Sequence, residues 1–288
     1  MRMMIVGADG QLGSDLVHQF EGQYELIPLT YEDGDIVSLD TVRSLMKEYR
    51  PDVMINTAAF HQVPRCEEEP IRAWEVNALG ARNLAICAQD SGIQLVQIST
   101  DYVFDGKKST PYVEQDKPNP LNVYANTKLA GEYFVSAICD RYMIVRVSGI
   151  YGKTRCIGKG SNFINTMLRL YREKKTIRVV TDEILTPTWT VEVSRQIGEM
   201  LTHHLNGLFH VTGEGACSWH EFAQSIFDIL ELPVRVQTAK VKDFPPTVKR
   251  PHYSVLENAG LKQAGVNKMK DWKAALAEFL TTTEVESL

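Results

Sequence analysis

Residues 7–13 read GADGQLG and directly follow the apolar run MRMMIV that opens the chain. Glycines at positions 7, 10 and 13 suit a strand-to-helix turn whose backbone N–H groups approach a pyrophosphate, because a β-carbon would obstruct that approach. The turn follows the first predicted strand and opens the first predicted helix, which gives the glycine spacing its weight. A phosphate-binding P-loop is excluded, since no Gly-Lys-Ser/Thr ending follows. Gly7, Gly10 and Gly13 therefore predict a dinucleotide-binding turn, the alternative being a tight turn without a ligand.

Outward from this turn, short apolar runs alternate with amphipathic stretches. The apolar runs are MRMMIV, YELIPL, DVMINTA and IQLVQIS, and the stretches between them are 11–20, 38–49 and 71–89. Near-continuous apolar strands separated by helices predict a parallel sheet covered on both faces. Ser38 should cap one helix and Gly92 should end another. A helix around 122–139 and a strand YMIVRV continue the pattern to about residue 148.

Beyond that point the chain becomes loop-rich and basic, as in GKTRCIGKGSN and VKDFPPTVKRP, with shorter helical runs at 163–172 and 219–230. The predicted fold class is α/β, a Rossmann-type doubly wound parallel sheet with a smaller C-terminal substrate-binding region. We assign residues 1–150 to an NAD(P)-binding domain and residues 151–288 mainly to substrate binding. Segments at about 185–205 are expected to return to the first domain.

Composition restricts the class of partner. The chain has 288 residues, 44% of them hydrophobic, and a net charge of -5, which gives no field for gripping a nucleic-acid backbone. No apolar run approaches the roughly 18 to 20 residues that span a bilayer, and the opening residues lead into glycines without a signal-peptide cleavage site. We expect a soluble cytoplasmic protein without a nucleic-acid or membrane partner. The cysteines are five, scattered and without a C-x-x-C pair, which predicts reduced, packed thiols and no metal site.

The predicted second strand ends at Thr30, and Asp33 and Asp35 follow closely. An enzyme specific for NAD would favour an acid here to hold the ribose hydroxyls. Either aspartate is equally well explained as a solvated turn residue. Because no arginine lies at the strand tip to hold a 2′-phosphate, the choice between NADH and NADPH stays open, and use of both is compatible with the sequence.

A polar group follows the fourth predicted strand, in QISTDYVFDG. Ser99, Thr100 and Asp101 should face the ligand crevice, because open α/β sheets bind ligands at the carboxyl ends of their strands. Tyr124 and Lys128 follow on a predicted helix. A phenol has a reference pKa near 10, and an ammonium one helical turn away can stabilise its anion for acid-base work. Thr100 can donate a hydrogen bond to a substrate carbonyl.

The same tyrosine–lysine spacing occurs a second time, at Tyr171 and Lys175 in LYREKK. There the neighbouring residues are charged and the lysines crowd the predicted end of a helix. A solvated helix terminus explains this second pair. The spacing alone is therefore weak evidence, and the case for the first pair depends on its surroundings.

Taken together, GADGQLG, STDYVFDG, PLNVYANTKLAGE and VNALGARNL resemble the extended short-chain dehydrogenase/reductase superfamily. Within it the chain is most similar to the dTDP-4-dehydrorhamnose reductase family. RPDVMINTAA, GSNFINTMLRL, TPT, GLFHVTGEGACSWHEFA and KRPHYSVL extend the resemblance, in the expected order, over nearly the whole chain.

The resemblance implies a role for each matching residue. Catalysis falls to Thr100, Tyr124 and Lys128, and substrate contact to Thr100, Asp101, Gly149, Asn162 and Arg250. The residues implied at NADPH or NADH are Gly10, Gln11, Leu12, Asp35, Ile36, Ala58, Ala59, Phe60, Asn77, Tyr124 and Lys128, beside Gly7, Gly13 and Ser99, which the glycine turn and the fourth strand place there. Asn77 would support the lysine through a water molecule.

Four positions depart from the family pattern. Gly149, in RVSGIYG, replaces a tryptophan that helps to place the deoxysugar. Trp189 is one candidate to fill the space, although an aromatic residue beside a proline-containing turn is more often plain packing. Pro64 replaces an aspartate, Glu183 a glutamine and Ala125 a glycine. These changes leave the identity of the sugar open.

The resemblance implies a reductase that transfers a hydride from NAD(P)H to the C4 keto group of dTDP-4-dehydro-L-rhamnose, giving dTDP-L-rhamnose for polysaccharide biosynthesis. Two alternatives remain. One is a reductase of another nucleotide-linked 4-keto sugar. The other is a non-catalytic NADP-binding regulatory subunit resembling that of methionine adenosyltransferase. The expected partner is a small-molecule dTDP-sugar, and a homodimer, with or without an interface metal, is compatible with the family.

Overall fold

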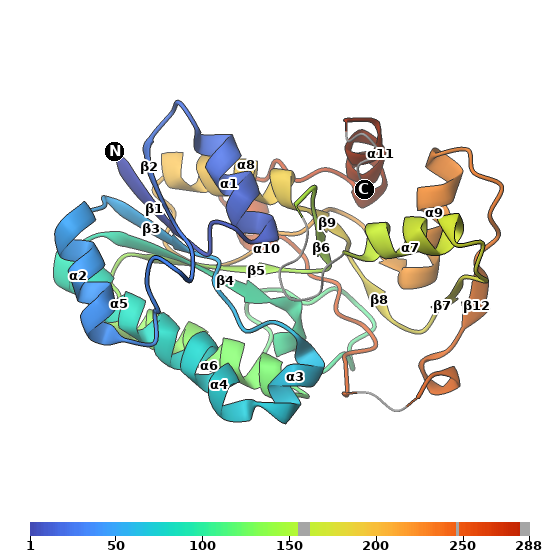
Figure 1. Cartoon of the computed structure of the whole chain (residues 1–288), viewed down its shortest axis with the longest axis horizontal. Coiled ribbons are helices and arrows are strands. Elements are labelled where there is room, and N and C mark those ends of the chain that lie inside the picture. The colour runs from blue at the N-terminus through green and yellow to red at the C-terminus, as the bar shows by residue number, and fades with distance from the viewer. Residues whose placement is uncertain (155–161, 246–247, 283–288) are drawn as a thin grey trace.

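A six-stranded parallel sheet forms the centre of the computed structural model, which describes residues 1–154, 162–245 and 248–282 (Figure 1). The strand order is β10-β5-β4-β3-β1-β2, and all five pairings are parallel. The strands are β1 (Arg2–Val6), β2 (Glu25–Leu29), β3 (Val53–Asn56), β4 (Gln94–Thr100), β5 (Tyr142–Val147) and β10 (Gly207–His210). The order reverses between β1 and β3. In such a sheet this switch point, at the carboxyl ends of the strands, is where a ligand binds.

Helices cover both faces of the sheet, as the sequence predicts. On one face Met3 and Ile5 of β1 pack with α1 (Gln11–Phe20) and α8 (Thr190–Thr202). On the other, the alternate residues Met4 and Val6 pack against a second helix layer. That layer comprises α2 (Leu39–Tyr49), α5 (Ala81–Ser91) and α6 (Val123–Ile138). Side chains of a strand alternate between faces, so the fully apolar β1 serves both layers.

The predicted helix at 71–89 is interrupted. It runs as α4 (Pro70–Trp74), a π-helical segment η1 (Glu75–Gly80) and α5. A β-carbon at Gly131 of α6 would lie 2.5 Å from the backbone oxygen of Asn77, so α6 and η1 approach too closely for any side chain at that glycine. The predicted helix ends are confirmed. Ser38 accepts a hydrogen bond from the Thr41 amide, and Gly92 ends α5 at a φ of 66°.

A smaller apolar cluster lies beside the sheet, where Tyr151, Trp189 and Phe222 are buried together. Its helices are α7 (Phe163–Arg172), α9 (Trp219–Ile229) and α11 (Trp272–Thr282). Its short strands pair as β6 (Ile150–Tyr151) with β9 (Thr188–Trp189), β8 (Ile184–Leu185) with β11 (Cys217–Ser218), and β7 (Arg178–Val180) with β12 (Gln237–Ala239). Since α8 packs beside α1, the chain returns to the large sheet after α7 and before α9, both of which belong to the smaller cluster. The division at residue 150 stays a prediction.

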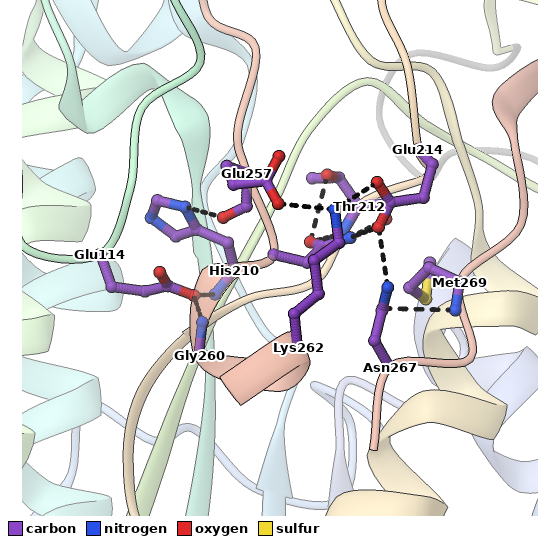
Figure 2. A network of polar contacts seen from close by, with 10 residues as sticks. Glu114, His210, Thr212, Glu214, Glu257, Gly260, Lys262, Asn267 and Met269 are labelled. Atoms are coloured by element: carbon purple, nitrogen blue, oxygen red, sulfur yellow. Dashed lines mark hydrogen bonds and ion pairs between the residues drawn. The ribbon is translucent and has the colours of Figure 1, made fainter. Parts of the chain in front are cut away.

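Polar contacts hold Glu114 and the segment 257–262 against the edge strand β10 and the residues that follow it (Figure 2). Glu114 Oε1 accepts hydrogen bonds of 3.0 Å from the amides of His210 and of Gly260, which lies in the first turn of the short helix α10 (Ala259–Gln263). Lys262 Nζ pairs with Glu214 at 2.8 Å and with Glu257 at 2.5 Å. These contacts fix the segment that follows Pro251 and Ser254, two residues on the wall of a cavity of about 670 Å³.

Cys66, Cys87, Cys139 and Cys217 are buried thiols, whereas Cys156 lies outside the described residues. Within the ranges that the structure describes, no helix combines the length and the apolar character needed to cross a bilayer.

Candidate active site

A cavity of about 670 Å³ opens at the carboxyl ends of the central strands, between the sheet and the smaller cluster. Most of the residues predicted for the site line it: Gly7, Gly10, Gln11, Leu12, Gly13, Asp35, Ile36, Ala58, Ala59, Phe60, Ser99, Thr100, Asp101, Tyr124, Lys128, Gly149 and Asn162. Asn77 and Arg250 are not among the lining residues. Residues that are far apart in the sequence therefore line the same cavity.

The three glycines of the first turn have different reasons to be glycine. Gly7 adopts a φ of +80°, and a β-carbon at Gly13 would lie 2.1 Å from the Gly7 oxygen, so the turn itself requires both. Gly10 has an ordinary φ of -72°, and a β-carbon there would lie 3.2 Å from the Gly7 oxygen, so the turn needs a glycine at this position less strictly than at the other two. Gly10 begins α1 without a side-chain cap, which leaves amides at the helix start to bind an anion. This cradle fits a pyrophosphate.

Thr100, Tyr124 and Lys128 meet on the cavity wall. Thr100 ends β4, and Tyr124 lies in the first turn of α6, which Asn122 caps by accepting a hydrogen bond from the Ala125 amide at 2.9 Å. The Thr100 hydroxyl lies near enough to Tyr124 to lower the pKa of the phenol, against the larger effect of burial. Lys128 Nζ donates to the Ile98 carbonyl at 2.6 Å, at a side chain only 4% exposed. An ammonium carries three donors, so others can meet ligand oxygens.

Burial shifts the pKa values of two side chains of this group. It raises the pKa of the Tyr124 phenol and lowers that of Lys128 to about 8. The expectation that Lys128 stabilises the phenolate is thus not reflected in the pKa of Tyr124. At neutral pH the phenol holds its proton and can give it to a developing alkoxide.

Behind Lys128 lies a buried ion pair that the sequence reasoning missed. Arg146 of β5 donates to both carboxylate oxygens of Glu132, at 2.9 and 2.6 Å, and Ser99 donates to the same carboxylate. The hydroxyl of Ser99, predicted to face the cofactor, is thereby committed to Glu132. Glu132 lies one helical turn beyond Lys128. Its negative charge raises the pKa of Lys128, against the larger effect of burial.

Asp101 presents a buried carboxyl to the cavity. It accepts hydrogen bonds from Thr100 at 3.1 Å and from Ser148 at 2.9 Å, and it is hydrogen-bonded to Ser254. Burial nevertheless raises its pKa to about 6. The bond to Thr100 orients that hydroxyl beside Tyr124.

The far end of the cavity contains an arginine that the strand tip lacks. Asp33 is turned into its own loop, where it accepts hydrogen bonds from the amide and hydroxyl of Thr30 at 2.7 and 2.8 Å. Asp35 lines the cavity instead, 3.5 Å from Arg72 of α4. Because Arg72 comes from another element, no pattern near the strand tip could indicate it.

Gly149 does not leave an open space. Its φ is +49°, and a β-carbon there would lie 2.6 Å from Leu185 Cδ1, so Leu185 already fills the position. Trp189, predicted as a candidate to fill the space, instead packs against Phe279, is buried in the smaller cluster and is not a lining residue. Of the two alternatives for Trp189, plain packing is therefore the one that the structure has. The aromatic side chains at this end are Phe163 and Trp219, with ring centroids 4.6 Å apart.

The remaining predicted residues have structural partners. Asn162 caps α7 and donates to the Gly152 carbonyl at 2.8 Å. The support of Lys128 by Asn77 through a water molecule stays a prediction. Asn77 holds the backbone of Phe60 through two hydrogen bonds and donates to Thr127 at 3.0 Å, so it also positions the cavity wall. The reason is its place on η1, which faces Phe60.

The altered positions differ in their access to the cavity. Pro64 is exposed in the first turn of α3 (Val63–Glu68) and is not a lining residue, whereas Glu183 lines the cavity and is hydrogen-bonded to Trp219. Burial raises the pKa of Glu183, and the charge of Arg250 partly opposes that effect. The Nε atom of Arg250 is buried without a hydrogen-bond partner among the described residues.

Comparisons with known proteins agree with this geometry. The family model described as the RmlD substrate binding domain matches residues 1–285. A dTDP-4-keto-6-deoxy-D-glucose reductase of Streptomyces niveus is 36% identical over 280 residues, covering 96% of each chain.

Two solved structures are similar over nearly the whole chain. A dTDP-4-dehydrorhamnose reductase of Clostridium acetobutylicum is 40% identical, with a TM-score of 0.93 and coverage of 98% of this chain and 99% of that one. A dTDP-4-dehydrorhamnose reductase of Bacillus anthracis in complex with NADP is 37% identical, with a TM-score of 0.94 and the same coverage.

Proposed function

Because the chain belongs to the RmlD substrate binding domain family, we propose that it reduces dTDP-4-dehydro-L-rhamnose to dTDP-L-rhamnose with NADPH or NADH. The observation that carries the proposal is that Thr100, Tyr124 and Lys128 lie on the wall of a cavity that also contains the glycine turn. A carbonyl reductase needs a dinucleotide cradle and a proton donor within reach of one another.

The residues divide the work of such a reduction. A bound NADPH or NADH would supply the hydride to C4 of the keto sugar from a C–H bond of its nicotinamide ring and would be left as the oxidised dinucleotide. In this structure the Thr100 hydroxyl donates its one hydrogen to Asp101; with the sugar bound it would turn and donate to the keto oxygen instead, which polarises the carbonyl. As the C4–H bond forms, the electrons of the C=O double bond move to oxygen, and Tyr124 gives its proton to that oxygen. Lys128 offers its remaining donors to the ribose hydroxyls, and water restores the phenol proton.

Glu183 favours a second candidate, a reductase of another dTDP-linked 4-keto sugar. Its carboxylate lines the cavity where the family pattern has a glutamine, and it can accept but not donate hydrogen bonds when ionised. The Streptomyces niveus relative is named for such a sugar. A non-catalytic role is less well supported, because Thr100, Tyr124 and Lys128 all line the cavity.

The direct test offers the protein NADPH or NADH with dTDP-4-dehydrorhamnose and follows the loss of the near-ultraviolet absorbance of the reduced nicotinamide. We expect turnover that depends on this sugar. Turnover only with dTDP-4-keto-6-deoxy-D-glucose would support the second candidate, and none with any 4-keto sugar would contradict both.

The cofactor cradle has its own test. Gly10→Val should leave the fold intact but raise the cofactor dissociation constant by about tenfold or more, because the new side chain enters the pyrophosphate path. A folded variant, verified by thermal unfolding, that binds the cofactor as tightly as the parent would show that the turn is structural only.

The proposed partners are the NADPH or NADH cofactor and the dTDP-linked keto sugar, with no nucleic acid or membrane. The proposed compartment is the cytoplasm, and a homodimer stays a prediction.

A further inference from the structure

The cavity end beside β2 is built from the loop after that strand and from α4. Thr30, Tyr31 and Asp35 line it from the loop, and Arg72 lines it from the helix. In a sheet of this kind the ribose of the adenosine lies at the tip of the second strand, where an acid binds the 2′-hydroxyl or an arginine accommodates a 2′-phosphate. An inference about cofactor preference at this end of the cavity rests on the proposed function, because it assumes that the cavity binds a dinucleotide.

The acids at this end are already engaged. Asp33 closes its own turn on Thr30. Asp35 Oδ1 accepts a hydrogen bond from the Val37 amide at 3.0 Å, while Oδ2 lies 3.5 Å from Arg72 Nη2. The carboxylate that would otherwise repel a 2′-phosphate is therefore partly neutralised by the arginine.

Arg72 itself is held loosely. Its Nη1 lies 3.3 Å from Glu75 and its Nη2 3.5 Å from Asp35, whereas strong charge-assisted hydrogen bonds are about 2.7 to 2.9 Å long. The side chain is 34% exposed, and ion pairs this accessible add little stability. The guanidinium can therefore exchange a carboxylate for a better-placed anion at little cost.

We propose that Arg72 binds the 2′-phosphate of NADPH and makes this protein prefer NADPH over NADH. A guanidinium presents paired N–H donors that match two oxygens of a phosphate. Arg72 would turn from Asp35 towards the phosphate, while Asp35 keeps its bond to the Val37 amide. With NADH the Asp35–Arg72 pair stays closed, so the site accepts both cofactors and holds NADPH more tightly.

The test measures cofactor binding without any sugar, by the fluorescence change of the reduced nicotinamide. Arg72→Gln should raise the dissociation constant of NADPH by about 10- to 100-fold, as expected for loss of hydrogen bonds to a charged group, and change that of NADH by less than about threefold. The isolated probe 2′,5′-ADP should lose its ability to compete in this variant, while 5′-AMP should compete as before.

Arg43→Gln is the matched control. Arg43 is an exposed arginine of α2 that does not line the cavity. Like Arg72, which pairs with Glu75, it pairs with a carboxylate three residues away on its helix, that of Asp40. It should change neither constant. A second variant, Asp35→Asn, should tighten NADPH binding, because it releases Arg72 and removes a negative charge near the phosphate.

Equal weakening of both cofactors by Arg72→Gln, or no weakening of NADPH, would overturn the proposal. Should Arg72→Gln fail to fold, Asp35→Asn alone tests the proposal. Unchanged or weaker binding of NADPH by the Asp35→Asn variant would contradict the proposal. Discrimination between cofactors by a protein that reduces no 4-keto sugar would contradict the proposed function and leave this inference standing.

Discussion

Two tyrosine–lysine pairs with the same spacing lie in very different surroundings. Tyr124 and Lys128 both belong to α6 and line the cavity, with Lys128 only 4% exposed. Tyr171 belongs to the last turn of α7, which ends at Arg172, so Lys175 lies beyond the helix. Lys175 pairs with Glu173 at 2.7 Å, with 60% of its side chain exposed, and Tyr171 packs near Phe227. The comparison teaches that spacing marks a candidate, while burial and partners give it chemistry.

The largest expected effect is that of Tyr124→Phe. The ring packs as before but loses its proton, so kcat should fall by about 10²–10⁴-fold, the usual contribution of general acid catalysis. Steady-state rates and cofactor binding are measured together, and binding should be retained. A loss below about fivefold, with chemistry rate-limiting, would remove the distinction between the two pairs.

Lys128→Met should act on both binding and stability. Loss of the ammonium should raise KM for the cofactor and lower kcat, with a combined loss of about 10- to 100-fold for a charged hydrogen-bonding group. It should also change how stability depends on pH. The folded-state pKa of Lys128 is about 8 against a usual 10.5, so between these values the unfolded chain holds a proton that the folded chain has lost. The free energy of unfolding contributed by Lys128 therefore rises with pH across that window.

Urea unfolding of the parent and Lys128→Met, repeated at several pH values, measures this contribution. The parent should gain stability relative to the variant as the pH rises from about 8 towards 10.5. A difference independent of pH would mean that the ammonium is better solvated than its burial indicates.

The smallest expected effect is that of Tyr171→Phe and Lys175→Met. Neither residue lines the cavity, so kcat and KM should stay within about twofold of the parent, as for exposed positions away from a site. Steady-state kinetics of both variants beside Tyr124→Phe completes the comparison. A large loss in either would show that the smaller cluster controls turnover through α7.

The fold was predictable because its determinants are local. Glycine spacing, apolar alternation and the caps at Ser38 and Gly92 each act over a few residues, and the structure confirms the strands and most helix ends. Where the prediction failed or left alternatives open, contacts over long sequence separations were responsible. Trp189 faces Phe279 instead of the sugar pocket, and the helix at 71–89 widens at η1 where α6 crosses it.

The sequence by itself determined the doubly wound sheet, the glycine turn and the position of Tyr124 one helical turn before Lys128. Only the tertiary structure decided which side chains share the cavity. It placed Leu185 against Gly149, Arg72 beside Asp35, and Glu132 with Arg146 behind the lysine. Helix and strand periodicity depends on neighbours along the chain, whereas charge pairing and pocket shape depend on which surfaces pack together, and that packing is settled only when the whole core forms.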